Sequence, residues 1–275
     1  MNDDSAAAPH LTPEEVLTLL RFVEKCRPII VGGQSINIWA ELFYGKNEEL
    51  DELGPLTSKD LDFFHNKSAE RALAQSLENG QLKLPQGDDN TPSAAVVTGM
   101  LGDKEVVVDF MAHVKGVDDK SILQNSITFA DADNPDSVSI TLMHPMDCVR
   151  SRLSNINSLG RTEEHSIVQA EASLLILDCY IDDQLNTEDK AANRRALDAL
   201  RDLEYVIRDY HVGKTTQQAF GDRLDPVAIM RHYIDDERIH EKVREKLLQG
   251  ILDRLTHKQE VADRRNSGHA PKSLG

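Results

Sequence analysis

Hydrophobic and polar positions follow two different patterns along the chain, and the change between them divides it. Up to about residue 143, short apolar runs end in glycine, proline or acidic segments, which is typical of strands alternating with helices. From residue 144 onward, apolar residues recur every three or four positions, which indicates helices. The pattern predicts an α+β domain over 1–143, an all-helical domain over 144–256 and a polar tail over 257–275.

Each half can be divided into expected elements. Thr12-Pro13-Glu14-Glu15 is a good helix start, since threonine caps, proline suits the first turn and glutamate reaches back. The other helices expected are 35–43, 68–78, 145–158, 163–183, 187–213, 226–233 and 239–256. The strands expected are 29–31, 60–64, 94–101, 104–112, 126–130 and 137–142. Residues 44–57 and 81–94 are expected to be loops, because they are polar and rich in turn residues.

A glycine turn follows the first expected strand. Ile29-Ile30-Val31 leads directly into Gly32-Gly33-Gln34-Ser35. Glycine lets a backbone turn tightly and approach a ligand closely, because no Cβ is in the way. A helix beginning near Ser35 would direct free N–H groups at that turn, and such a turn can hold phosphate oxygens. The alternative is an ordinary strand-to-helix turn.

Three aspartates stand in strand-like surroundings. Asp60 and Asp62 are two apart, so a strand would place both on one face. Asp109 lies within Val106-Val107-Val108-Asp109-Phe110, where an unpaired charge would be costly to bury. Neighbouring carboxylates repel each other unless a cation lies between them. The three would make an oxygen-rich site for Mg²⁺, completed by nucleotide phosphates. The alternatives are a solvated edge strand for Asp60 and Asp62, and an ion-paired carboxylate for Asp109.

The glycine turn, the Asp-x-Asp strand and the third acidic strand occur in the order seen in one large family. The first half of the chain resembles the nucleotidyltransferase superfamily, which has the polymerase-β-like fold, and it is most similar to the AbiEii/AbiGii-like nucleotidyltransferases. Several of these act as toxins in bacterial toxin–antitoxin pairs. The resemblance therefore implies a small mixed nucleotidyltransferase sheet flanked by helices, followed by the helical domain.

The resemblance also implies an activity and roles for residues. It implies Mg²⁺- or Mn²⁺-dependent transfer of a nucleotidyl group from a nucleoside triphosphate to a hydroxyl of a protein, an RNA or a small molecule. An antitoxin protein is a possible partner. Asp60 and Asp62 would bind both metal ions. Asp109 would bind the catalytic metal and help activate the acceptor hydroxyl. Gly32, Gly33 and Ser35 would hold the β- and γ-phosphates.

The resemblance also implies that one basic residue of the helical half binds the nucleotide. Related chains carry a lysine that points to the phosphates after a similar proline-containing segment, and Arg152 falls near that place. Arginine can hold phosphate bidentately. A solvated or ion-paired arginine is the alternative. The sequence after Arg161, Thr-Glu-Glu-His, departs from the pattern of the branch.

Two other functional classes remain open. A degenerate member of the family would bind a nucleotide or a partner without catalysis, and a scaffold would use the helical half as an interaction surface. Trp39 could stack on a base or lie in the core.

Composition limits the partners and the cellular compartment that we expect for the protein. The 275 residues carry a net charge of −16, which disfavours wholesale coating of nucleic acid. Three widely spaced cysteines form neither a zinc pattern nor a disulfide framework, and no leader-like or membrane-spanning run is present. These features predict a cytoplasmic protein without a membrane partner.

Overall fold

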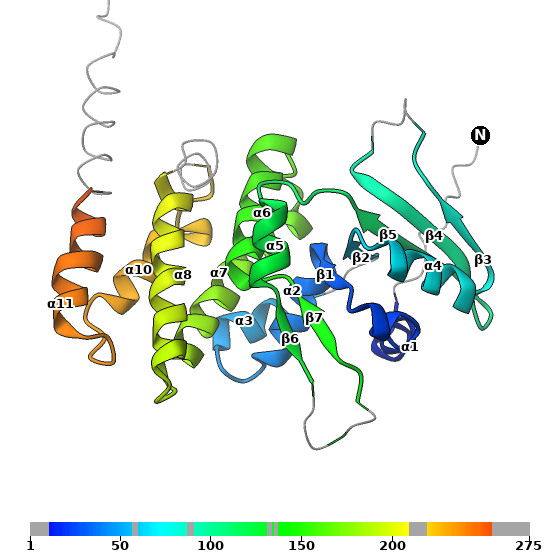
Figure 1. The fold of residues 1–275 in the computed structure, drawn as a ribbon. Coiled ribbons are helices and arrows are strands. Elements are labelled where there is room, and N and C mark those ends of the chain that lie inside the picture. Colours follow the sequence, from blue (N-terminus) through cyan, green and yellow to red (C-terminus); the bar gives the residue numbers. More distant parts are fainter. Residues whose placement is uncertain are drawn as a thin grey trace, which may run out of the picture. The chain divides into compact units, whose positions relative to one another are not determined.

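The chain folds as an α+β protein with a mixed sheet, as the sequence predicts, and the described residues form seven strands where six were expected (Figure 1). The computed structural model describes residues 11–56, 60–86, 91–130, 134, 137–208 and 219–254. It divides into a first unit ending at Leu177 and a second beginning at Asp178. This division falls inside a helix, α7 (Glu164–Leu185), whereas the expected boundary at 143/144 lies within the first unit. No described helix is long and apolar enough to cross a membrane.

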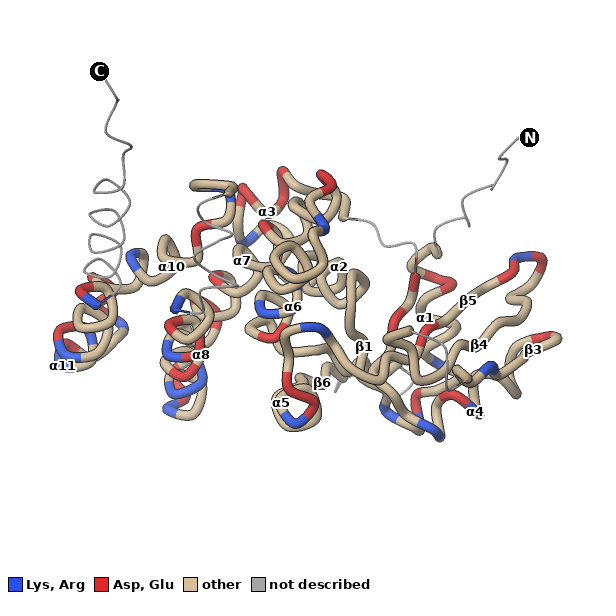
Figure 2. The backbone as a smooth tube through the Cα atoms, turned by 90° about the horizontal axis from the view of Figure 1, so that it is seen from above, with Lys and Arg blue, Asp and Glu red and all other residues tan. Residues whose placement is uncertain are grey.

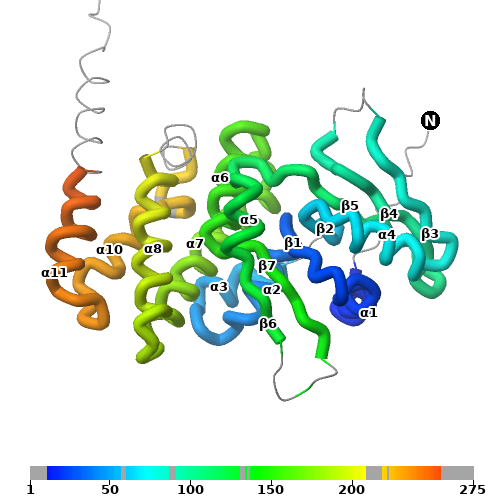
Figure 3. The backbone as a smooth tube through the Cα atoms, in the orientation of Figure 1, coloured from blue at the N-terminus to red at the C-terminus, as the bar shows by residue number. Residues whose placement is uncertain are grey.

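The sheet has the strand order β3-β4-β5-β2-β1-β7-β6 (Figures 1 and 3). Its strands are β1 (Ile29–Val31), β2 (Leu61–Phe64), β3 (Glu78–Lys83), β4 (Ser93–Leu101), β5 (Lys104–Met111), β6 (Ile127–Phe129) and β7 (Ile140–Leu142). The β2–β5 and β1–β7 pairs are parallel, and the other pairs are antiparallel. The three-residue β1 therefore lies between β2 and β7, and the aspartate strands β2 and β5 are neighbours.

The first residues of the two helices on either side of β1 explain where each helix begins. Helix α1 (Pro13–Val23) has the expected capping box, in which Thr12 Oγ1 accepts from Glu15 N–H and Glu15 accepts from Thr12 N–H. Helix α2 (Gly32–Leu42) follows β1 without a loop, so it begins earlier than the expected start near Ser35. The glycines are thus the first residues of the helix.

One face of the sheet is covered by α4 (Lys67–Ser76), which packs on β3, β4 and α1 (Figure 1). Leu77, which follows α4, lies against Gly99 of β4 so closely that a Cβ there would be 2.8 Å from the Leu77 Cβ. Val97 and, across the ladder, Val108 alternate onto this same buried face. The residues between them on β4 and β5 consequently face the other way.

Three elements differ from expectation. Helix α3 (Glu48–Leu53) and strand β3 occupy parts of the predicted loops 44–57 and 81–94, and α5 (Asp119–Asn125) was not predicted. Each helix has a side-chain cap, Asn47 or Asp118, but buries a single apolar residue, Leu50 or Ile122. One buried residue gives no periodicity to detect. Strand β3 is a polar edge strand stabilised by its ladder with β4.

Helix α6 (Pro145–Leu159) contacts α2 through its buried side. The Ser35 hydroxyl lies 3.4 Å from Cys148 Sγ. Nearby, Trp39 Nε1–H donates to the Met143 carbonyl at 2.9 Å, and its ring packs on Phe43 and Phe129. Trp39 is 2% exposed, so it belongs to the core and not to a base-stacking surface.

The described elements of the second unit are helical. They are the end of α7, α8 (Lys190–Arg208), η3 (Gly221–Leu224), α10 (Pro226–Tyr233), α11 (Glu241–Val243) and the π-helical turn η4 (Arg244–Leu248). Arg238 binds Asp182 of α7 at 2.8 Å and Asp236 at 2.6 Å. Both charges occur along α8 (Figure 2). The expected tail 257–275 lies outside the described residues.

Candidate functional site

The centre of the site is a pair of aspartates on adjacent strands. Asp62 of β2 and Asp109 of β5 are directly opposite each other in the parallel ladder. Partners in register point to the same side of a sheet. Their neighbours Leu61, Val108 and Phe110 are fully buried on the α4 side, so both carboxylates lie on the other face. Val107, on the same face of β5 as Asp109, is 42% exposed, so solvent reaches this part of the sheet.

The environment of Asp62 disfavours its charged form. Burial raises the pKa of Asp62 to about 6, and repulsion from Asp109 and Asp60 acts in the same direction. Arg152 and Arg161 oppose this rise in the pKa, but they do not cancel it. A perturbed carboxyl beside a second carboxyl is typical of functional sites and of cation sites. The other four residues are therefore near enough to influence the ionisation of Asp62.

Gly32 makes room for the Asp62 carboxylate. Its φ is +69°, in the left-handed region that glycine adopts without strain. A Cβ at Gly32 would overlap Asp62 Oδ2 and would lie 3.1 Å from Asp62 Cγ. The glycine turn thus brings the first turn of α2 directly against Asp62, and any larger residue at position 32 would displace it.

The Asp109 carboxylate is held by a residue of β4, the neighbour of β5 on the side away from β2. Ser93 Oγ at the start of β4 donates to Asp109 Oδ1 at 2.9 Å. An irregularity in the β4–β5 register between Ser93 and Ala95 accompanies this contact. The hydrogen bond fixes one carboxylate oxygen and leaves the acceptor capacity of Asp109 incompletely used.

Two arginines provide positive charge near the aspartates. Arg152 of α6 is half-buried, and this burial lowers the pKa of its guanidinium, while the nearby Cys148 and Asp62 act to raise it. Its Nε atom is buried and has no hydrogen-bond partner among the described residues. Arg161 is exposed just beyond Gly160, whose φ of +63° ends α6. A guanidinium whose buried Nε–H is unused is suited to an anionic ligand.

The sequence-predicted residues are not all brought together. Asp62, Asp109, Gly32 and Arg152 converge, and Asp60 is exposed at the entry to β2, within electrostatic range of Asp62. Gly33 is buried in the first turn of α2. Within the described ranges, no three His, Cys, Asp or Glu side chains are grouped as a metal site.

Ser35 is placed differently from the predicted phosphate contact. Its side chain is fully buried, and its hydroxyl donates to the Gly32 carbonyl at 3.3 Å while touching Cys148 Sγ. Burial raises the pKa of Cys148 to about 12, so this thiol stays protonated. The Ser35 hydroxyl thus serves the packing of α2 on α6, and the structure gives no support for a phosphate contact by it.

Two residues could not be placed in the site from sequence. Arg161 stands just before the segment that departs from the pattern of the nucleotidyltransferases the chain resembles, and its proximity to Asp62 depends on where α6 ends. Ser93 reaches Asp109 through the irregular register, which no residue pattern signals. No protein-family model matches the chain, and no curated protein matches it.

Proposed function

We propose that the protein is a divalent-cation-dependent nucleotidyltransferase that moves a nucleotidyl group from a nucleoside triphosphate to a hydroxyl acceptor. The observation that carries the proposal is the in-register pair of Asp62 and Asp109 beside the Gly32 turn. The resemblance to the nucleotidyltransferases requires this juxtaposition of two acidic strands and a glycine turn. The arginines beside the pair add the charge that a triphosphate needs.

The carboxylates fit a hard cation. Asp62 and Asp109 supply oxygen donors from neighbouring strands, and the pKa of Asp62 is raised first by burial and then by repulsion from Asp109 and Asp60, which a bound cation would offset. Bound Mg²⁺ or Mn²⁺ would neutralise phosphate oxygens and stabilise the charge that builds on them in the transition state. Asp60, exposed at the start of β2, would join the pair when a cation is bound.

The chain's own residues have separate tasks in the reaction. Arg152 and Arg161 hold phosphate oxygens, and Gly32 allows the triphosphate to approach the first turn of α2. Asp109, oriented by Ser93, accepts the proton of the acceptor hydroxyl. The hydroxyl oxygen then bonds to the α-phosphorus, the bond from that phosphorus to the β-phosphate bridging oxygen breaks, and pyrophosphate leaves.

The position of the label distinguishes this reaction from others. The protein is incubated with Mn²⁺ or Mg²⁺, a cell extract and each of the four triphosphates, labelled at either the α- or the γ-phosphate. Nucleotidyl transfer places the α-label, and not the γ-label, on an acceptor. Transfer of the γ-label would indicate a kinase, and nucleotide binding without any transfer would indicate a member of the same fold that only binds.

A further inference from the structure

The aspartate pair belongs to a row of residues that runs across the sheet. Asp62 of β2 is in register with Asp109 of β5. Asp109 is in register with Val96 of β4, and Val96 with Lys83 of β3. Residues in register point to the same face of a sheet. Val96 is therefore the direct neighbour of Asp109 on the face away from α4, and Lys83 lies two strands, or about 10 Å, from Asp109.

Two further rows extend this surface along the same strands. Val107 of β5 is in register with Thr98 of β4, and Glu105 of β5 is in register with Met100 of β4. Alternate residues of a strand share a face, so these side chains point to the same side as Asp109. We call this surface the open face, and its residues are Lys83, Val96, Thr98, Met100, Glu105 and Val107.

The open face is more apolar than a solvated surface requires. Val107 is 42% exposed, and Val96 and Thr98 are partly exposed. A sheet with one solvated face normally directs its polar residues toward water. Strand β4, however, carries no charged residue (Figure 2), and the outward neighbours of Asp109 on β4 and β5 include two valines. Packing of the core does not explain these outward valines, so they suit contact with another molecule.

The charge of the open face disfavours a nucleic acid as that molecule. Of its residues, Lys83 is basic and Glu105 is acidic. Lys104, at the start of β5, points to the opposite face, where its ammonium lies 2.6 Å from a Glu15 oxygen. Nucleic-acid binding depends on lysines and arginines that neutralise phosphates. A phosphate backbone crossing the open face would meet the charge of Asp109 and Glu105 with a single lysine to offset it.

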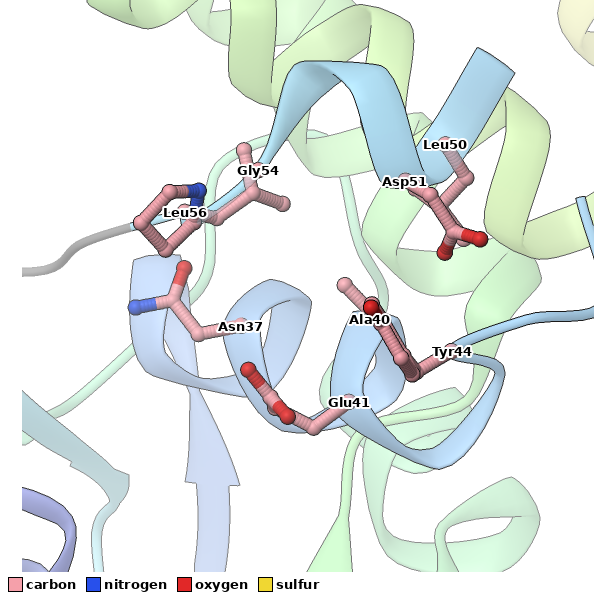
Figure 4. Close-up of a pocket in the computed structure, with 9 residues that line it drawn as sticks. Asn37, Ala40, Glu41, Tyr44, Leu50, Asp51, Gly54 and Leu56 are labelled. Atoms are coloured by element: carbon pink, nitrogen blue, oxygen red, sulfur yellow. The ribbon is translucent and has the colours of Figure 1, made fainter. Parts of the chain in front are cut away.

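A small acceptor would need an enclosed site beside the pair. The first unit has a cleft of about 350 Å³ between α2 and α3 (Figure 4). Its lining lies between Asn37 and Leu56 and includes neither Asp62 nor Asp109. Gly32, the residue of α2 that meets Asp62, lies more than a helical turn before Asn37. The open face, in contrast, is continuous with the pair, and its β-branched surface suits a larger and partly apolar acceptor.

We infer that the acceptor is a serine, threonine or tyrosine hydroxyl of a polypeptide segment that lies along β5 on the open face. The inference rests on the proposed nucleotidyl transfer. An extended segment advances about 3.3 Å per residue, as β5 does, so its alternate residues match Asp109, Val107 and Glu105 in turn. The hydroxyl lies at Asp109, an apolar side chain two residues away rests on Val107, and a basic side chain four residues away pairs with Glu105.

The segment supplies the nucleophile of the proposed reaction. Its hydroxyl oxygen bonds to the α-phosphorus as the hydroxyl proton passes to Asp109. The bond from that phosphorus to the bridging oxygen of the β-phosphate breaks, and pyrophosphate leaves. The side chain of the segment keeps the nucleotide through a phosphodiester bond.

Binding is tested first without nucleotide. Fluorescence anisotropy follows titration of the full chain, at low salt, into three labelled probes. They are the peptide Ser-Ala-Leu-Ala-Arg flanked by glycines, the same peptide with glutamate in place of arginine, and a single-stranded oligoribonucleotide. Each peptide is made in both sequence orders, since a segment can run either way along β5. The arginine peptide should bind saturably in one order, and about threefold or more tightly than its glutamate counterpart. No peptide binding, or tighter binding of the oligoribonucleotide, would overturn the inference.

Exchange of one charge locates the peptide on the open face. Glu105→Lys reverses a charge on this face, and Glu49→Lys makes the same change on exposed α3, outside it. Glu105→Lys should bind the glutamate peptide more tightly than the arginine peptide, and Glu105→Gln should bind the two equally. Glu49→Lys should keep the order of wild type. The same order of affinities in all three variants would place the peptide elsewhere and contradict the inference.

Label transfer distinguishes failure of the inference from failure of the proposed function. With Mn²⁺ and α-labelled triphosphate, wild type should label the arginine peptide, and its labelled product in a cell extract should be degraded by protease and resist ribonuclease. Label on a product that survives protease would overturn the inference and leave the proposed function standing. Peptide binding that depends on Glu105, without label on any acceptor, would overturn the proposed function and the acceptor role with it.

Discussion

At the scale of single residues, the protonation of Asp62 is the most informative property of the site. The folded state raises the pKa of this carboxyl to about 6 from an ordinary value of 3.8. Between these values the folded protein holds a proton that the unfolded chain has released. Stability therefore falls as the pH rises through this window, and the loss persists at neutral pH unless a bound cation compensates it.

Replacing Asp62 by asparagine should stabilise the metal-free protein at pH 7.5. The change removes the buried charge, and the gain is on the order of 1–3 kcal/mol. The gain should shrink toward zero at pH 4.5, where wild-type Asp62 is protonated. Urea unfolding in a chelator at both pH values measures it, with Asp103→Asn on the exposed β4–β5 turn as the control. The same small shift at both pH values would contradict the raised pKa that burial and the neighbouring carboxylates give Asp62.

Gly32→Ala should lower the free energy of unfolding by more than the cost of placing an alanine at a positive φ. Gly102→Ala is the matched control, because Gly102 also has a positive φ, +61°, but has open space where a Cβ would lie. The control should cost about 1–2 kcal/mol, as expected for a left-handed alanine. Gly32→Ala should cost about 1–3 kcal/mol more, because its Cβ meets Asp62. Equal unfolding free energies in the two variants would mean that Asp62 does not lie against the turn.

At the scale of elements, local patterns identified the parts that bury repeated apolar residues. The 29–31 strand, the β4–β5 hairpin and α1 were predicted because alternation, a Gly-Asp turn and a capping box are local signals. Helices α3 and α5 were missed because Leu50 and Ile122 are their only buried residues. The start of α2 was predicted too late because two glycines discourage a helix assignment, although here they form its first turn.

The restriction to local sequence signals also explains how much of the site could be predicted. Asp62 and Asp109 could be proposed because aspartate is unusual in apolar strands, whereas Arg152 could be proposed only from the resemblance to the nucleotidyltransferases. The burial of the Ser35 hydroxyl against Cys148 could not be predicted, because a hydroxyl after a glycine turn resembles a ligand contact until its packing partner is known. Ser93 and Arg161 depend on a strand irregularity and on a helix end, which arise only from the whole structure.

Trp39 allows a test of the contact between α2 and the segment after β7. Trp39→Phe removes the indole N–H that donates to Met143, so it should cost about 1–2 kcal/mol of unfolding free energy. Nucleotide affinity should not change, because the ring is buried in the core. Urea unfolding measures the free energy of unfolding of this variant, and calorimetric titration measures its nucleotide affinity. Lost affinity with unchanged stability would indicate that the ring stacks on a base instead.

At the scale of the whole molecule, the net charge of −16 opposes a triphosphate, which must find local positive charge. Arg152 is the arginine best placed to supply it, since its buried Nε has no partner among the described residues. Arg152→Met should weaken triphosphate binding about tenfold or more, whereas Arg194→Met on the exposed side of α8 should leave it unchanged. Equal affinities of the two variants in a calorimetric titration would remove Arg152 from the site.

The most direct test of the account compares Asp109→Asn with wild type in the α-label transfer assay. The variant keeps the size of the side chain but loses its charge and its capacity to take a proton. Label transfer should fall by on the order of 10² or more, because a preorganised charged group acting on the transition state is worth several kcal/mol. Triphosphate affinity should fall much less, since Asp60 and Asp62 remain, and Asp103→Asn should behave like wild type. Equal label transfer by Asp109→Asn and wild type would contradict the assignment of this aspartate pair as the centre of the reaction.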